Sequence, residues 1–152
     1  MITGLHHTAI CVSDMARSLA FYRDLLGLKV VRQVELSDRR LDQVVGVPRA
    51  RFKVAILQVG TSQERLELLQ YLSPQGRPLP TGFRQCDVGV THVCLNVTEI
   101  ERLYQELVAH GVRFNSPIQT MDPTEAGTAK IVYLHDPDGI TLELLEIVKE
   151  AP

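Results

Sequence analysis

The chain has 152 residues, of which 45% are hydrophobic and 22% charged, and this size suits one globular domain or two small modules that share a core. Its net charge of −2 argues against nucleic acid or an anionic membrane as a partner. No window of the sequence holds the roughly 18 consecutive apolar residues that a membrane-spanning helix needs. The first residues lack the pattern of a signal peptide and the three cysteines suggest no disulfide framework, so we expect a cytoplasmic protein.

The first half of the chain predicts a strand, a helix and three further strands. Residues 5–12 read as a short strand, because turn-forming residues bound them on both sides. A helix follows and ends at Gly27, which supplies a left-handed stop. Apolar residues at helical spacing give this helix one buried face: Met15, Leu19, Tyr22 and Leu26. The later strands include residues 53–57 and 66–69.

The second half of the chain repeats this order. Residues 90–97 read as a strand, and residues 100–108 form a helical pattern that ends at Gly111. Thr98 and Glu101 have the spacing of a capping box, in which each side chain accepts a hydrogen bond from a free backbone N–H at the start of the helix. Two later segments match the last strands of the first half: residues 130–134 and 142–145.

This repeat divides the chain into two modules. The first covers residues 1–72 and the second covers residues 90–152, with a linker rich in proline and glycine over residues 73–89. The first module carries nine extra residues, which we place around residues 37–51. Because each copy reads as a strand, a helix and three strands, we expect an α+β fold that is built twice from one βαβββ unit.

Each module contributes one histidine and one glutamate at matching positions. His7 matches His92 at a separation of 85 residues, and Glu67 matches Glu143 at a separation of 76. Side chains alternate across a strand, so all four can face one concave sheet surface. Two imidazoles and two carboxylates suit one divalent ion of zinc, nickel, cobalt, manganese or iron, and suit calcium poorly. We therefore predict that these four residues bind a metal ion.

The alternative is that these histidines have only a structural role. A single histidine in a strand is more often structural than a ligand, whereas a glutamate inside an apolar strand is costly to bury without a partner. The recurrence of both residue types at matching positions favours the metal. The remaining histidines lack this symmetry, and we expect them to be structural or exposed: His6, His110 and His135.

Four segments of the chain resemble the vicinal oxygen chelate superfamily, which includes glyoxalase I, methylmalonyl-CoA epimerase, fosfomycin-resistance proteins and extradiol dioxygenases. They contain the four predicted ligands and lie in both modules: residues 7–28, 66–68, 91–93 and 136–144. The resemblance implies paired βαβββ modules that form an incomplete barrel around the metal. It also implies a small-molecule substrate and a homodimer.

The presence of Glu67 favours the branch of glyoxalase I and the epimerase, because dioxygenases and fosfomycin-type proteins typically use two histidines and one glutamate. Two positions depart from glyoxalase I. Cys11 stands where that enzyme commonly has an arginine that contacts glutathione, and Tyr71 stands where it commonly has asparagine. The Asp-Pro-Asp-Gly stretch at residues 136–139 departs from the glycine-rich stretch that is usual in the epimerase.

A site with these four ligands suits proton transfer beside a carbonyl, in which the ion stabilises an enolate and a glutamate acts as base. We expect a lyase or isomerase of glyoxalase or epimerase type, with Glu143 as the first candidate for the base by resemblance and Glu67 as the second. Four residues are expected to line the substrate pocket: Cys11, Leu69, Tyr71 and Leu145. Two alternatives stay open, an Fe(II) extradiol-type dioxygenase and a non-catalytic resistance protein that sequesters a ligand.

Overall fold

The fold was examined in a computed structural model that describes residues 1–80, 82–122 and 127–149. The chain divides into two compact units, Met1–Pro78 and Leu79–Pro152, and each is described by itself. The boundary between the units falls inside the stretch 73–89, whose assignment as a linker stays a prediction.

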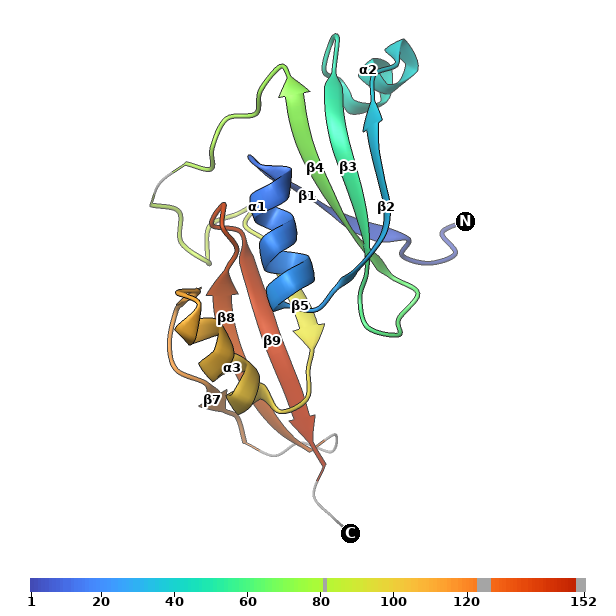
Figure 1. The fold of residues 1–152 in the computed structure, drawn as a ribbon. Helices are drawn as coiled ribbons and strands as arrows, with labels where there is room; N and C mark the ends of the chain where they lie inside the picture. Colours follow the sequence, from blue (N-terminus) through green and yellow to red (C-terminus); the bar gives the residue numbers. More distant parts are fainter. Residues whose placement is uncertain (81, 123–126, 150–152) are drawn as a thin grey trace. The chain divides into compact units, whose positions relative to one another are not determined.

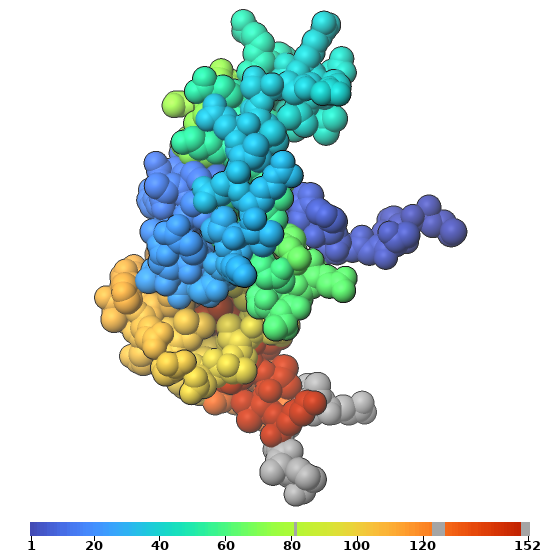
Figure 2. Space-filling model, turned by 45° about the vertical axis from the view of Figure 1, so that its right-hand side comes forward, coloured from blue at the N-terminus to red at the C-terminus, as the bar shows by residue number. Residues whose placement is uncertain are grey.

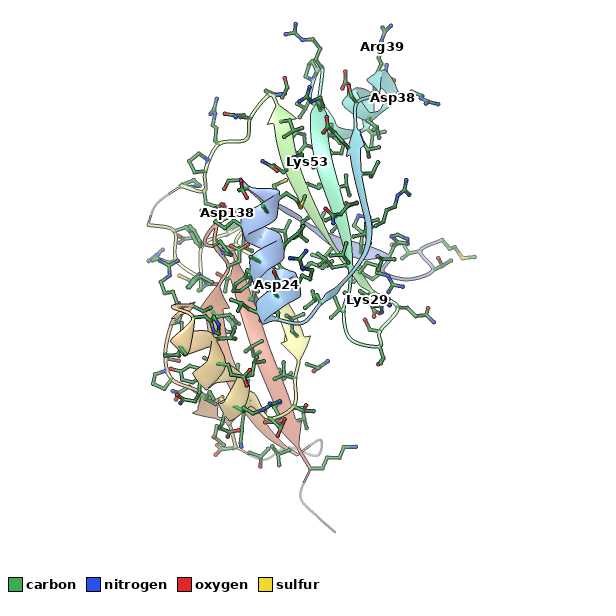
Figure 3. All side chains as sticks on the ribbon, viewed as in Figure 1. Asp24, Lys29, Asp38, Arg39, Lys53 and Asp138 are labelled. Atoms are coloured by element: carbon green, nitrogen blue, oxygen red, sulfur yellow. The ribbon has the colours of Figure 1, made fainter. Side chains whose placement is uncertain are left out.

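Unit 1 is a mixed four-stranded sheet with a helix against one face (Figure 1). The strand order is β1-β4-β3-β2, in which β1 runs parallel to β4 and the other neighbours are antiparallel. In Figure 3, Lys29 is the first residue of β2, Asp38 lies just before α2, and Lys53 lies on β3. The elements are β1 (His7–Cys11), α1 (Met15–Leu19), η1 (Ala20–Leu25), β2 (Lys29–Leu36), α2 (Arg39–Val45), β3 (Arg51–Gln58) and β4 (Arg65–Ser73).

The predicted first helix is present, and its second half widens into the π-helical turn η1. The side chain of Asp14 caps its start by accepting a hydrogen bond from the backbone N–H of Arg17 at 2.7 Å. Gly27 follows its end with φ of 71°, a left-handed conformation that glycine adopts without strain. The helix covers the sheet face that carries the fully buried Leu66 and Leu68.

The extra stretch of unit 1 forms α2 and its flanking loops, which make up the cyan end of the unit in Figure 2. Asp42 in α2 accepts hydrogen bonds from the backbone N–H groups of Arg49 and Ala50, both at 2.8 Å, and so fixes the loop that returns to β3. Three apolar residues of this stretch pack against the buried cluster of Ala50, Phe52 and Val54: Leu41, Val45 and Val47.

Unit 2 has the same plan with a shorter second strand. Its sheet has the order β5-β9-β8-β6, with β7 also paired to β8. The position of β2 in unit 1 is therefore taken in unit 2 by two short segments, each of two residues. The elements are β5 (Val93–Asn96), α3 (Ile100–Ala109), β6 (Arg113–Phe114), β7 (Gln119–Thr120), β8 (Thr128–His135) and β9 (Thr141–Val148).

The predicted capping box of α3 is wrong. Glu99, not Thr98, is the N-cap residue, its backbone is left-handed, and its side chain makes no capping hydrogen bond. Instead Glu146, in β9, accepts hydrogen bonds from the backbone N–H groups of Glu99 at 2.7 Å and Ile100 at 3.3 Å. A carboxylate from a distant strand thus satisfies the free donors that the local sequence was expected to satisfy.

Strand register shows that the two units are equivalent. In unit 1, Ala9 of β1 lies opposite Glu67 of β4, and in unit 2, Cys94 of β5 lies opposite Glu143 of β9. These pairs keep the separations of 85 and 76 residues that relate the two histidines and the two glutamates. The α+β fold with repeated units is confirmed. Among the helices of the described ranges, none is both long and apolar enough to span a membrane.

Candidate functional site

The predicted alternation of side chains is present on the strands that carry the histidines. In β1, His7, Ala9 and Cys11 are exposed while Ile10 is buried, although Thr8, which alternation places on the same face as Ile10, is exposed as well. In unit 2 the ladder begins at Val93, so the strand is shorter than predicted and His92 precedes it by one residue. His92 and Cys94 are nevertheless both exposed, as expected for residues that share a face.

The first His–Glu pair lies within unit 1. His7 Nε2 and Glu67 Oε2 are 3.4 Å apart, with side chains 40% and 20% exposed. Glu67 is held in place because its neighbours in β4, Leu66 and Leu68, are fully buried on the opposite face. His6 contacts the other side of the His7 ring, with 2.8 Å between the two Nδ1 atoms.

The second pair, in unit 2, is closer and more deeply set. His92 Nε2 and Glu143 Oε2 are 3.0 Å apart, with side chains 39% and 13% exposed. Leu142 and Leu144 fix Glu143 in β9 in the same way, since both are fully buried.

Two polar residues beside this second pair were not among the predicted site residues. Register places Cys94 on one side of Glu143 and Tyr133 on the other. The Tyr133 hydroxyl lies 3.4 Å from His92 Nε2, and the two rings are 5.0 Å apart between centroids. The match between residues 53–57 and 130–134 could have identified Tyr133, because it aligns Tyr133 with Ile56, which lies opposite Glu67.

Burial and the charge of Glu143 hold both of these acidic groups in their protonated forms. Although Cys94 as a residue is exposed, partial burial of its thiol raises the pKa of Cys94 to about 11, and the charge of Glu143 and a hydrogen bond with it contribute to the shift. The pKa of Tyr133 is also raised, first by burial and then by the charges of Glu143 and Cys94. At neutral pH a thiol and a phenol can therefore donate hydrogen bonds beside Glu143.

The predicted pocket residues are partly buried or exposed, and they lie in different units. Leu69 and Tyr71 in β4 and Leu145 in β9 are each half-buried, whereas Cys11 is exposed at the end of β1. Burial raises the pKa of Cys11, and burial followed by the charge of Cys11 raises the pKa of Tyr71. Tyr71 also packs against Phe52, with ring centroids 5.0 Å apart. A role for these four residues in substrate binding stays a prediction.

The geometry of each pair fits two ligands of one metal ion. Two donor atoms that each bind one metal ion at about 2.1 Å lie about 3.0 Å from each other when the donor–metal–donor angle is a right angle. They lie about 3.4 Å from each other when that angle is tetrahedral. The separations of 3.0 and 3.4 Å fall at these values. Within residues 1–80, 82–122 and 127–149, no group of three or more histidine, cysteine, aspartate or glutamate side chains gathers closely enough to hold a metal. Each unit thus offers half of the predicted four-ligand set.

The remaining histidines have structural hydrogen bonds or lie beside a site residue. His110 Nδ1 is 2.8 Å from the backbone oxygen of Glu106 at the end of α3. His135 Nε2 is 2.7 Å from Asn115 Oδ1, and burial, followed by the charge of Arg113, lowers the pKa of His135. Neither contacts a glutamate of the His–Glu pairs.

Comparison with known proteins gives relatives of similar length and fold. The chain is 27% identical over 144 residues to a probable lactoylglutathione lyase of Synechocystis, covering 93% of this chain and 94% of the relative. It is 29% identical over 147 residues to mouse mitochondrial methylmalonyl-CoA epimerase, covering 92% of this chain and 71% of the relative. The crystal structure of a glyoxalase family protein from Bacillus cereus superposes with a TM-score of 0.85 at 17% identity, covering 96% and 95% of the two chains.

The family model of the glyoxalase, bleomycin resistance protein and dioxygenase proteins matches residues 4–144. This match includes both units and all four residues of the His–Glu pairs. The chain therefore belongs to the Glyoxalase/Bleomycin resistance protein/Dioxygenase superfamily.

Proposed function

We propose that this protein is a divalent-metal-dependent lyase or isomerase of glyoxalase or epimerase type that acts on a small carbonyl substrate. The observation that carries the proposal is the recurrence of one His–Glu pair at equivalent register positions in both units, at 3.4 Å and 3.0 Å. The relatives named as a lactoylglutathione lyase and a methylmalonyl-CoA epimerase support this class of reaction.

In this proposal His7, Glu67, His92 and Glu143 hold the ion. When bound, the ion would supply positive charge to the substrate carbonyl and make the adjacent C–H bond more acidic. Glu143 removes that proton and returns it to the neighbouring carbon, whereas inversion at the same carbon would need a proton from the opposite face, for which Glu67 is the candidate donor. The protonated Cys94 and Tyr133 beside Glu143 can hold the carboxylate in one orientation through hydrogen bonds.

On the conjugate of methylglyoxal with glutathione we expect weak or no activity. Cys11 lacks the permanent positive charge with which an arginine would bind an anionic peptide, and Tyr71 offers one hydroxyl in place of the amide of an asparagine. A half-buried leucine beside them in β4, Leu69, instead favours an apolar group on the substrate. The homodimer and the cytoplasmic location stay predictions from the sequence.

Metal binding is the first part of the test. The purified full chain is expected to retain about one divalent ion per chain by elemental analysis. His92→Ala and Glu143→Ala should each lose most of it, because each removes one of four ligands. His135→Ala is the control, since His135 contacts neither pair, and it should retain the ion. Full metal content in both ligand variants would contradict the proposal.

Proton exchange is the second part. Methylmalonyl-CoA and the hemithioacetal of methylglyoxal and glutathione are incubated with the metal-loaded protein in heavy water, and deuterium at the α-carbon is followed by NMR. Exchange of methylmalonyl-CoA would support proton transfer, and Glu143→Gln should slow it by about 100- to 10,000-fold because the base is removed. Efficient turnover of the hemithioacetal would show that the substrate assignment is wrong. Oxygen uptake with a catechol would replace the proposal with a dioxygenase.

A further inference from the structure

His7 has a contact at each of its two ring nitrogens. Its Nε2 faces Glu67 Oε2 at 3.4 Å, and its Nδ1 lies 2.8 Å from Nδ1 of His6. The two rings meet edge to face, with centroids 5.1 Å apart. At the equivalent position before His92, unit 2 has Thr91, which has no imidazole to offer.

A contact between two neutral imidazole nitrogens needs one donor and one acceptor, so only two arrangements are possible. In the first, His6 Nδ1–H donates to His7 Nδ1, and His7 carries its own proton on Nε2. In the second, His7 Nδ1–H donates to His6 Nδ1, and His7 Nε2 carries a lone pair. Each arrangement has two neutral rings and two ring protons, so neither ring gains or loses charge between them.

The partner of Nε2 decides which arrangement is favoured. Without a metal, Nε2 faces a carboxylate oxygen, and an N–H at that position is attracted to Glu67 while a lone pair is repelled. With a metal, Nε2 must carry the lone pair, and the proton of His7 must then lie on Nδ1. His6 can match both states, because its Nδ1 can donate in the first and accept in the second.

We propose that His6 is a positioning residue that holds the His7 ring and serves its Nδ1 in both tautomers. The metal-free half of this inference stands on the contacts within unit 1 alone, whereas the metal-bound half rests on the proposed function. A residue that satisfies the second nitrogen of a ligand histidine fixes its orientation and its tautomer, and its loss commonly weakens metal binding by about 10- to 100-fold.

The test uses the full chain labelled with ¹⁵N in its histidines, at a pH well above the ordinary imidazole pKa. Nitrogen NMR of the ring atoms distinguishes the two tautomers. In the metal-free protein we expect His6 as the Nδ1–H tautomer and His7 as the Nε2–H tautomer. On addition of Zn²⁺, His7 should become the Nδ1–H tautomer and His6 the Nε2–H tautomer.

Three variants test the same inference by zinc affinity in calorimetry. His6→Ala should weaken zinc binding by about 10- to 100-fold, and His6→Asn, whose amide can donate or accept, should restore part of it. Thr91→Ala is the matched control in unit 2 and should leave the affinity unchanged. His6 as the Nε2–H tautomer in the metal-free protein, or an affinity of His6→Ala within twofold of the parent, would overturn the inference.

The two proposals can fail separately. If the parent protein binds no Zn²⁺, the proposed function fails, while the tautomers of the metal-free protein still decide whether His6 donates to His7. If the parent binds Zn²⁺ and His6→Ala binds it equally well, the proposed function stands and the role of His6 is rejected.

Discussion

The two units place the same His–Glu pair in different surroundings. In unit 1, Glu67 lies between Ala9 and Ile56 on the neighbouring strands, and neither can donate a hydrogen bond from its side chain. In unit 2, the same two positions beside Glu143 hold Cys94 and Tyr133, both of which can. The repeat thus keeps strand register and the positions of the histidines and glutamates, while its two carboxylates have different neighbours.

A second difference concerns the helix that covers each sheet. Gln70 in β4 and Glu146 in β9 occupy equivalent positions, and each accepts a hydrogen bond from a backbone N–H at the start of its helix. In unit 1 the Asp14 side chain also caps the helix, whereas the equivalent Glu99 in unit 2 makes no such bond. The start of α3 therefore depends on Glu146 more than the start of α1 depends on Gln70.

The largest expected effect tests whether the two cores are equivalent. Leu68 and Leu144 occupy matching positions and are both fully buried, so Leu68→Ala and Leu144→Ala should each lower the free energy of unfolding by about 2–5 kcal/mol. Urea unfolding followed by circular dichroism measures both. The corresponding changes to methionine keep most of the volume and should cost less than about 1.5 kcal/mol. Clearly unequal losses in the two alanine variants would mean that the repeat does not extend to packing.

A smaller effect tests the different surroundings of the two glutamates. Because the pKa of Cys94 is raised to about 11, its reactive thiolate forms only as the pH rises toward that value. At about pH 8 its alkylation should be on the order of 100-fold slower than that of an ordinary exposed thiol. Iodoacetamide labelling with peptide mass spectrometry measures this, with the exposed Cys86 as reference.

Glu143→Gln separates the causes of this slow reaction. The change removes the charge of Glu143 and should speed the alkylation of Cys94, but not to the rate of Cys86, because burial is the largest cause of the raised pKa. Equal labelling rates for Cys94 and Cys86 in the parent protein would show that the thiolate of Cys94 is not disfavoured beside Glu143.

The smallest expected effect sharpens the comparison of the helix starts. Glu146→Ala leaves two backbone N–H groups of α3 without a side-chain acceptor and should cost about 1–2 kcal/mol in the free energy of unfolding. Gln70→Ala should cost less, because Asp14 still caps α1. Thermal or urea unfolding measures both variants. A larger loss in Gln70→Ala would contradict the difference between the units.

Much of this molecule was predictable because it repeats. The separations of 85 and 76 residues, together with the alternation of side chains along a strand, were enough to pair His7 with Glu67 and His92 with Glu143 before any coordinates. The gathering of all four ligands at one ion is still a prediction, because each pair lies within its own unit.

Local periodicity in the sequence was enough to predict the strands, the helices and the face of each strand. The repeat was enough to predict the matching positions of the two histidines and two glutamates. The tertiary structure alone decided which groups far apart in the chain meet. Glu146 caps a helix that begins 46 residues earlier, and Tyr133 reaches His92 across 41 residues, because strand register brings them together. A capping motif or a hydrophobic period describes only near neighbours, whereas a free backbone N–H donates a hydrogen bond to whichever oxygen the fold brings closest.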